Sequence, residues 1–226
     1  MIGGMGEAQK GILRAFIQAR MSSKRFPGKV LAPLRGKPLI AHVLTQVARV
    51  IPPDRITVAT STEPSDDPLA GYVREIGISI YRGPLEDVFK RFQLCLKEYP
   101  CNWFFRVCAD SPLVEGALFQ TMMAHRSRSD IDLVTNVYPR TFPKGHSLEM
   151  VRSITFAGID STRLTADEKE HITKVYYNHP QEFRMLNIES TDPALSKANF
   201  SIDTPEDLFR LEALLRESEG SVIYER

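Results

Sequence analysis

The sequence has few cysteines and no long apolar run, and each shortage excludes a class of protein. Cys95, Cys101 and Cys108 are odd in number and form no C-x-x-C pair, so we expect neither a disulfide framework nor a zinc site. Reduced thiols are typical of the cytosol, which predicts a cytoplasmic protein. No apolar stretch reaches the ~20 residues that span a bilayer, so no membrane contact is expected.

The chain also lacks an excess of charge of one sign. Its 29 Lys and Arg against 28 Asp and Glu give a formal net charge of +1, whereas nucleic-acid-binding proteins usually carry a basic face and a high pI. No nucleic-acid partner is therefore expected. The start, MIGGMGEAQKG, has neither an apolar signal core nor a twin arginine, and we expect the first dozen residues to form a frayed tail.

Several common site motifs are missing. The sequence contains no G-x-x-x-x-G-K-[ST] and no G-x-G-x-x-G after its first strand, which disfavours a P-loop and a dinucleotide fold. A D-x-D at Asp130 and Asp132 can hold a metal in a nucleotide-sugar glycosyltransferase. Here it precedes a predicted strand, so a solvated turn is predicted instead. The histidines show no metal-ligand spacing such as H-x-x-x-H.

Short apolar strands alternate with amphipathic helices through most of the 226 residues. Such alternation predicts βαβ units and a mostly parallel sheet flanked by helices. We expect one α/β domain over residues 1–226, with 138–190 as an insertion or smaller antiparallel lobe. The predicted strands are 15–17, 56–60, 78–81, 103–108, 133–135 and 199–202, and the predicted helices are 37–50, 66–76, 86–99, 115–125, 168–177 and one that begins within 203–207.

The most informative stretch is AFIQARMSSKRFPGKVL, residues 15–31, where an apolar strand leads into a cationic loop. Arg20, Lys24, Arg25 and Lys29 crowd together there and repel one another unless an anion joins them. Cationic side chains and loop N–H groups suit a polyphosphate. A solvated basic loop is the alternative, and the residues alone leave both interpretations open.

Asp110 and Asp203 each directly follow a predicted strand. Because ligands of open α/β sheets bind at the carboxyl ends of the strands, both are expected near the cationic loop. A nucleotide-bound Mg²⁺ is often held by one or two carboxylates together with phosphate oxygens and water, and these two could supply them. The alternatives are an Asx-turn at Asp110 and a plain helix start after Asp203, with Thr204 as N-cap and Asp207 in a capping box.

Other polar residues fall at or near the same edge of the predicted sheet. Thr60–Ser61 and Arg82–Gly83 end two predicted strands, which places them among the ligand-binding loops. Glu149 is a candidate hydrogen-bond partner for a polar substrate, with a plain surface carboxylate as the alternative. His171 has no single interpretation from the residues alone. Cys108 is expected in the core.

These segments resemble a known family. IQARMSSKRFPGKVL resembles the nucleotide-binding signature of the sugar-acid cytidylyltransferases, which include the acylneuraminate and 3-deoxy-manno-octulosonate enzymes, and most closely their spore-coat polysaccharide biosynthesis branch. VATSTEPSDDPLAGYV, YRGPLEDVFKRF, RVCADSPLV, EHITKVYYNHPQEF and NFSIDTPEDLFRL resemble that branch in the same order. The resemblance implies a Rossmann-like α/β fold of the nucleotide-diphospho-sugar transferase type. It also implies transfer of CMP from CTP to an acidic sugar for a surface polysaccharide or glycan, with pyrophosphate released.

Two alternatives stand beside this implied function. The first is a nucleotidyltransferase that uses another nucleotide or a sugar phosphate. The second is a nucleotide-binding protein without catalysis.

The resemblance also implies roles for individual residues. Arg20, Arg25 and Lys29 would hold the triphosphate, while Asp110 and Asp203 would hold Mg²⁺. The implied contacts of the nucleotide are Ala19, Ser22, Ser23, Thr60, Ser61, Arg82 and Gly83. Glu149, His171 and the 138–190 region would shape the sugar site, and because this region often meets a second subunit in the family, a homodimer is implied.

The chain departs from the family pattern at a few positions. Ser22 and Lys24 stand where the branch commonly has glycine and threonine, changes that a phosphate loop tolerates. Ser147 replaces a usual aspartate and Lys174 a usual proline, and both fall in the implied sugar site. The resemblance therefore describes the nucleotide donor better than the acceptor.

Overall fold

The computed structural model describes residues 11–223, so most of the predicted N-terminal tail lies outside the described residues. The strands within that range are β1 Leu13–Gln18, β2 Pro33–Leu34, β3 Lys37–Pro38, β4 Ile56–Ser61, β5 Ser79–Gly83, β6 Trp103–Cys108, β7 Leu133–Thr135, β8 Glu149–Arg152 and β9 Met185–Asn187. Seven of these described strands form one sheet in the order β5-β4-β1-β6-β8-β7-β9. Its pairs are parallel except where β8 meets β6 and β7, which confirms the predicted α/β class.

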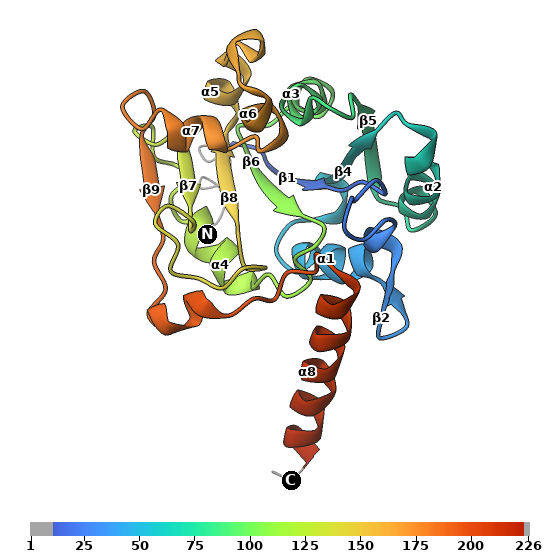
Figure 1. Cartoon of the computed structure of the whole chain (residues 1–226). Coiled ribbons are helices and arrows are strands. Elements are labelled where there is room, and N and C mark those ends of the chain that lie inside the picture. The colour runs from blue at the N-terminus through green and yellow to red at the C-terminus, as the bar shows by residue number, and fades with distance from the viewer. Residues whose placement is uncertain (1–10, 224–226) are drawn as a thin grey trace, which may run out of the picture.

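Helices cover both faces of this sheet (Figure 1). The helices are α1 Leu39–Ala48, α2 Asp67–Glu75, α3 Val88–Glu98, α4 Gly116–Met123, α5 Ser153–Gly158, α6 Ala166–Glu170, α7 Lys174–Asn178 and α8 Pro205–Ile223. Buried residues of α1, α2 and α4 share one apolar cluster, and those of α3, α5 and α7 share another on the opposite face. Strands covered on both faces read as continuous apolar runs, which is why β1 and β6 were recognisable in the sequence.

Aromatic rings fill the core between the sheet and α3. Phe16 of β1 lies 5.0 Å from Phe104 of β6, measured between ring centroids, and Phe104 lies 5.2 Å from Phe156 of α5. All three side chains are fully buried. Such close packing holds the central strands in place, so the residues at their carboxyl ends have well-defined positions.

Two predicted elements are wrong. The helix expected over 168–177 is broken into α6 and α7. Between them, Thr173 donates its hydroxyl to the carboxylate of Glu149 at 2.7 Å. The strand expected over 199–202 is a single bridge between Lys144 and Asn199. The Asn199 side chain accepts from the amide and hydroxyl of Ser201 and bends the chain there.

The 138–190 region supplies β8 and β9 to the main sheet as well as α5, α6 and α7. Neither α5 nor β9 was expected. Gly145 allows the segment before β8 to lie against the chain near Phe200, since it has a φ of +91° and a Cβ there would lie 2.5 Å from backbone atoms of residues 200 and 201. No side chain but hydrogen fits that position.

The D-x-D before β7 is only partly the solvated turn that was predicted. Asp130 is exposed, but Asp132 is buried and accepts two side-chain hydrogen bonds from Arg184, both at 2.9 Å. Burial opposes ionisation, yet the hydrogen bonds from Arg184 and Thr155 lower the pKa of Asp132 to about 2. Asp132 therefore fastens the start of β9 to β7.

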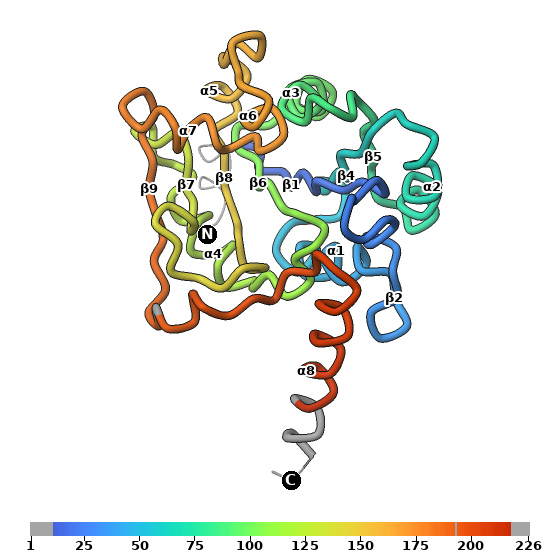
Figure 2. The backbone as a smooth tube through the Cα atoms, viewed as in Figure 1, coloured from blue at the N-terminus to red at the C-terminus, as the bar shows by residue number. Residues whose placement is uncertain are grey.

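The last segments return to the centre of the molecule. Residues between β9 and α8 run back beneath the sheet, orange to red in Figure 2, and the amide of Ile202 donates to the carbonyl of Asp110 at 3.0 Å. Helix α8 then extends away from the body (Figure 1).

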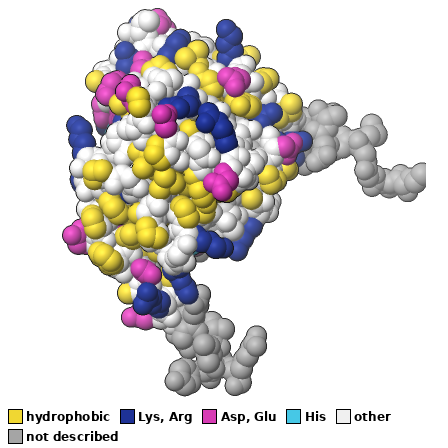
Figure 3. All heavy atoms as spheres, turned by 90° about the vertical axis from the view of Figure 1, so that its right-hand side faces the viewer, with side chains coloured by type: hydrophobic (Ala, Val, Ile, Leu, Met, Phe, Trp, Pro, Cys, Tyr) yellow, Lys and Arg dark blue, Asp and Glu magenta, His cyan; other side chains and the backbone are white. Residues whose placement is uncertain are grey.

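On the face that carries α2 and β5, charged side chains of both signs are interspersed with hydrophobic ones (Figure 3). None of the helices in residues 11–223 is apolar enough over a sufficient length to cross a bilayer.

Candidate active site

The cationic loop is folded by its own backbone. The amides of Ser23 and Gly28 both donate to the carbonyl of Met21, at 2.9 and 2.8 Å. Gly28 has a φ of 76°, a left-handed conformation that glycine adopts without strain, and a short 3₁₀ turn, Lys29–Leu31, begins directly after it. This turn directs Lys29 back toward the carboxyl ends of β1 and β6.

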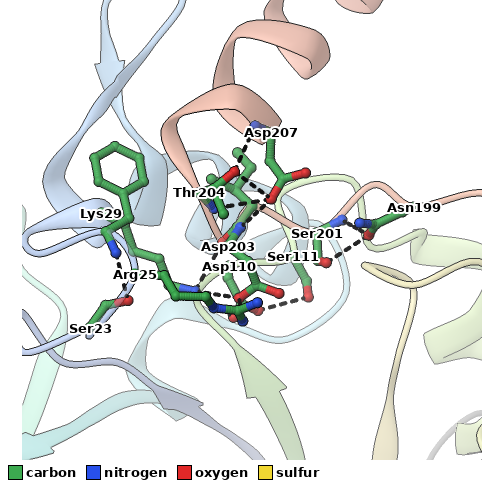
Figure 4. A network of polar contacts seen from close by, with 12 residues as sticks. Ser23, Arg25, Lys29, Asp110, Ser111, Asn199, Ser201, Asp203, Thr204 and Asp207 are labelled. Atoms are coloured by element: carbon green, nitrogen blue, oxygen red, sulfur yellow. Dashed lines mark hydrogen bonds and ion pairs between the residues drawn. The ribbon is translucent and has the colours of Figure 1, made fainter.

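Lys29 lies between the two aspartates that follow predicted strands (Figure 4). Its Nζ is 2.9 Å from Oδ2 of Asp110 and 3.1 Å from Oδ1 of Asp203, and it also donates to the carbonyl of Ile202 at 2.9 Å. Burial lowers the pKa of Lys29, but the two carboxylates raise it more, so that it lies above the ordinary 10.5. The ammonium therefore stays charged at neutral pH.

The helix-start interpretation of 203–207 is correct and leaves Asp203 free for this contact. Oδ2 of Asp207 accepts from the amides of Asp203 and Thr204, both at 3.0 Å, and the amide of Asp207 donates to Oγ1 of Thr204. This capping box begins α8. The Asp203 carboxylate takes no part in it and points to Lys29 and Arg25 instead.

Arg20 and Arg25, the other two residues expected to hold the triphosphate, also have carboxylate partners. Nη2 of Arg25 is 2.9 Å from Asp203, and Nη2 of Arg20 is 2.8 Å from Glu170 at the end of α6. The Arg25 side chain is 65% exposed, so it can leave its partner at little cost. All three cations that were expected to hold a triphosphate are therefore balanced by carboxylates.

These side chains line one cavity of about 460 Å³ at the carboxyl ends of β1 and β6. Of the predicted site residues, it collects Ala19, Arg20, Ser23, Arg25, Lys29, Asp110, His171 and Asp203. Within residues 11–223, Ser22, Thr60, Ser61, Arg82, Gly83 and Glu149 lie outside its lining. Cys108, expected in the core, instead lies half-buried at the cavity wall. Burial raises the pKa of Cys108 to about 12, so its sulfur is a protonated thiol and no nucleophile.

Comparison with known proteins identifies the family. Residues 15–226 match the family model described as Cytidylyltransferase. The chain belongs to the cytidylyltransferase family. Its relative SpsF, the spore coat polysaccharide biosynthesis protein of Bacillus subtilis (strain 168), is 30% identical over 210 residues, which cover 89% of this chain and 85% of SpsF. The predicted family is thus confirmed, and the protein is an enzyme of the nucleotidyltransferase class.

Solved structures show the same fold. A cytidylyltransferase from Leptospira borgpetersenii serovar Hardjo-bovis (strain JB197) superposes with a TM-score of 0.82 at 23% identity, over 92% of this chain and 95% of that one. A CMP:2-keto-3-deoxy-manno-octonic acid synthetase, solved as a complex with CTP, gives a TM-score of 0.67 at 16% identity, over 91% and 99% of the two chains. The cytidylyltransferase fold therefore extends over almost the whole chain.

In this cytidylyltransferase, Thr60 and Ser61 are fully buried and bonded to Asp66. The Asp66 carboxylate also accepts from the amides of Ser61 and Met21, at 3.0 and 2.7 Å. It thereby joins the end of β4 to the cationic loop. The importance of Asp66 was missed because the sequence shows only an acidic residue at a helix start.

Arg82 and Gly83 brace the same region from β5. Arg82 donates to the carbonyls of Ser61 and Glu63, at 2.8 and 2.9 Å, and forms an ion pair with Asp67 at 2.7 Å. A Cβ at Gly83 would lie only 3.0 Å from the side chain of Arg91. Contact of Thr60, Ser61, Arg82 and Gly83 with a nucleotide stays a prediction.

Replacing Asp66 by asparagine is expected to destabilise the fold by about 2–4 kcal/mol, because an amide cannot accept from all of these buried donors. Burial opposes ionisation, but hydrogen bonds from Ser61, Met21 and Thr60 hold the pKa of Asp66 below 3.8. Its contribution is thus full above the unfolded pKa near 3.8 and is lost as the pH falls through the lower folded value.

Urea unfolding at pH 7 and at several values below pH 4 measures this effect. The difference in unfolding free energy between wild type and Asp66→Asn should shrink as the pH falls below 3.8 and through the lower pKa of Asp66 in the folded protein. Asp67→Asn is the matched control, since the Asp67 side chain is 62% exposed, and should change stability by less than about 1 kcal/mol. Equal losses of unfolding free energy in the two variants would contradict the conclusion that Asp66 joins β4 to the cationic loop.

Sequence reasoning also missed a polar group on the floor of the cavity. Arg106 is a charged residue within the otherwise apolar strand WFFRVC, which was the available signal. Its Nη1 donates to Glu149 at 3.2 Å, and its Nε and Nη2 donate to Oε1 of Gln18 at 3.1 and 2.8 Å. Glu149 is 3% exposed, so it is not a surface carboxylate. It also accepts hydroxyl hydrogen bonds from Thr173 and Tyr177.

The chemistry of Asp110 and Asp203 fits a divalent cation. The two carboxylates already converge on one cationic atom, Nζ of Lys29. No cluster of three or more Asp, Glu, His or Cys side chains able to hold a metal occurs in the described part of the chain. Two carboxylates are what Mg²⁺ takes from a protein when phosphate oxygens and water supply its other ligands.

Proposed function

We propose that this enzyme transfers CMP from CTP to an acidic sugar, sialic-acid-like or related, and releases pyrophosphate. The observation that carries the proposal is the position of Lys29 between Asp110 and Asp203, with Arg20 and Arg25 beside it in one cavity. A triphosphate needs several cations close together, and a nucleotide-bound Mg²⁺ needs carboxylates next to them. The fold relative that was solved with CTP and the relative SpsF support the same donor and the same type of pathway.

The cationic side chains would exchange partners when the donor binds. Arg20, Arg25 and Lys29 are bonded to Glu170, Asp203 and Asp110 in this structure. A triphosphate carries more charge than these separate carboxylates and accepts shorter, charge-assisted hydrogen bonds. Lys29 is the least exposed of these cations, at 12% of its side chain, so its charge is the least screened by water.

The protein's own residues then have a positioning and electrostatic role. The anomeric hydroxyl of the sugar must approach the α-phosphorus in line with the bond to pyrophosphate. Lys29 and Arg25 would stabilise the negative charge that gathers on the departing oxygens. Mg²⁺ held by Asp110 and Asp203 would supply further neutralisation of phosphate charge.

The acceptor would lie beside β8 and α7. Ser147, which replaces the usual aspartate of the spore-coat branch, accepts from Nη1 of Arg140 at 3.0 Å. An acid at this position would neutralise Arg140, whereas serine leaves its charge available to an anionic acceptor. We propose that His171 and the network around Glu149 shape this side of the site. The homodimer and the cytoplasmic location stay predictions.

Pyrophosphate release tests the proposal. With CTP, Mg²⁺ and either N-acetylneuraminate or 3-deoxy-manno-octulosonate, we expect release that depends on both the sugar acid and the metal. UTP, ATP and GTP should support much slower release under the same conditions. Turnover with a sugar phosphate but with neither acid would contradict the proposed acceptor class, and faster turnover with another nucleotide would contradict the proposed donor.

A further inference from the structure

A row of polar side chains crosses the sheet and ends at the cavity. The strand register places Thr135 of β7 opposite Glu149 of β8, and Glu149 opposite Arg106 of β6. Gln18 of β1 follows on the diagonal, since Phe16 is the register partner of Arg106. Because alternate residues of a strand share a face, all four polar side chains lie on the face covered by α3 and α7.

Arg106 fixes the orientation of the Gln18 amide. A guanidinium has donors and no acceptor, so the amide atom that it contacts twice must be the oxygen Oε1. The Nε2 group is consequently turned away from Arg106. Gln18 lines the cavity, and Nε2 is not among the buried, unpartnered side-chain atoms of the described residues. Nε2 also forms no hydrogen bond within the described residues, so it is not a buried atom, and its two N–H donors are accessible at the cavity wall.

This orientation is held from behind by buried partners. Glu149 neutralises Arg106 and is itself fixed by hydroxyl hydrogen bonds from Thr173 at 2.7 Å and Tyr177 at 2.9 Å. Tyr177 and Thr135 share a further hydrogen bond of 2.8 Å. A donor that is oriented before the ligand arrives loses little entropy on binding. Gln18 is thus a preorganised donor, and the charges behind it cancel.

We propose that Gln18, oriented by Arg106, is a specificity-determining residue that donates to an oxygen of the acceptor sugar, an inference that rests on the proposed function. The network behind Gln18 runs toward β8, β7 and α7 and includes no residue of β4 or β5. The residues expected to bind the metal and the triphosphate lie on other segments. Lys29 lies in the loop after β1, Asp110 follows β6, and Asp203 follows Ile202. Gln18 lies at the end of β1, between these loops and the network on β6, β8 and β7. The strand order of the sheet reverses between β1 and β6, which is where ligands of open α/β sheets bind.

The chemistry of the recognised group follows from the donor. A neutral amide N–H2 binds a carboxylate, carbonyl or hydroxyl oxygen, and it binds an ionised carboxylate most strongly. An acidic sugar offers such oxygens, whereas a carboxylate at position 18 would repel them. The amide of Gln18, oriented by Arg106, would therefore favour an acceptor that places an ionised carboxylate there over one that places a hydroxyl, a cation or an apolar edge there.

Steady-state kinetics of Gln18→Glu test the proposal. Glutamate keeps the size of glutamine and an oxygen for Arg106 but replaces the inward donor by a second oxygen. We expect the KM for the sugar acid to rise roughly ten- to hundredfold, the effect of losing a hydrogen bond to a charged group, while the KM for CTP changes less than about twofold. Gln18→Met, which adds no charge, should raise the same KM by a smaller factor. Gln120→Glu, the same change at an exposed residue of α4, should alter neither value.

The side-chain amide of Gln18 also reports binding directly by ¹⁵N NMR, without turnover. The Gln18 signal is assigned by its loss in Gln18→Met. We expect it to stay in place when α,β-methylene-CTP and Mg²⁺ are added, and to shift when N-acetylneuraminate or 3-deoxy-manno-octulosonate follows. A shift caused by the nucleotide analogue, or equal rises of both KM values in Gln18→Glu, would overturn the inference and leave the proposed function intact. If the nucleotide analogue binds to no part of the protein, the proposed function itself fails.

Discussion

Asp110→Asn is expected to lower the rate of pyrophosphate release from CTP by at least about a hundredfold, because it removes a charged ligand from the site that positions and neutralises the triphosphate. The side chain is 27% exposed and is bonded to Lys29 and Ser111. Lys29 also donates to Asp203 and to the carbonyl of Ile202, and we expect these contacts to remain in the variant. The fold should therefore lose no more than about 1 kcal/mol of stability.

Two measurements separate this prediction from a general loss of structure. Circular dichroism and urea unfolding should be close to wild type, while Mn²⁺ binding in the presence of CTP, followed by electron paramagnetic resonance, should weaken. Asp54→Asn, the same change at an exposed residue, should leave turnover and Mn²⁺ binding unchanged. Undiminished pyrophosphate release by Asp110→Asn would show that this carboxylate holds no metal needed for the reaction.

Lys29→Met is expected to reduce turnover by about a hundred- to a thousandfold, equivalent to about 3–4 kcal/mol of transition-state stabilisation. Methionine keeps most of the length of the side chain but removes the charge that should act on the departing phosphate. It also leaves Asp110 and Asp203 facing each other without their shared cation. Mn²⁺ should therefore bind more tightly than to wild type when no nucleotide is present, while CTP binds more weakly.

Opposite shifts in the two affinities make this prediction specific. Lys29→Arg keeps the charge but replaces a compact ammonium by a planar fork, so its metal affinity should stay near that of wild type. Lys24→Met removes a charge from an exposed residue of the same loop and should affect CTP binding far less. Weaker binding of both Mn²⁺ and CTP to Lys29→Met would contradict the position assigned to the ammonium.

Much of the fold was predictable because its signals are local. In α1, the buried residues Leu39, Ile40, Val43, Leu44 and Val47 are the ones that recur three and four apart. The central strands were visible as apolar runs because helices cover both faces of the sheet. Features that involve distant contacts were not visible. Thr173, between α6 and α7, bonds to Glu149 of β8, and the segment at residues 199–202 pairs with Lys144.

The candidate site shows the same division. Lys29, Asp110 and Asp203 were predicted together because each comes after a predicted strand. The strand expected before Asp203 is only a single bridge, but the chain there still brings the Asp203 carboxylate, like that of Asp110, to within about 3 Å of Nζ of Lys29. Asp66 and Arg106 were not assigned roles, since their partners lie on other strands and loops. A single carboxylate at a helix start and a single arginine in a strand carry no information about those partners.

The melting temperature in the presence of nucleotides is the measurement that bears most directly on a site for magnesium and CTP. At about a hundredfold excess over its dissociation constant a ligand adds about 2.7 kcal/mol of stability, which for a domain of this size is a rise of about 5–10 °C. We expect this rise with CTP and Mg²⁺, a smaller one with UTP, ATP or GTP, and little in Lys29→Met. An unchanged melting temperature with CTP and Mg²⁺, or an equal rise with ATP, would contradict the assignment of this cavity as a site for magnesium and CTP.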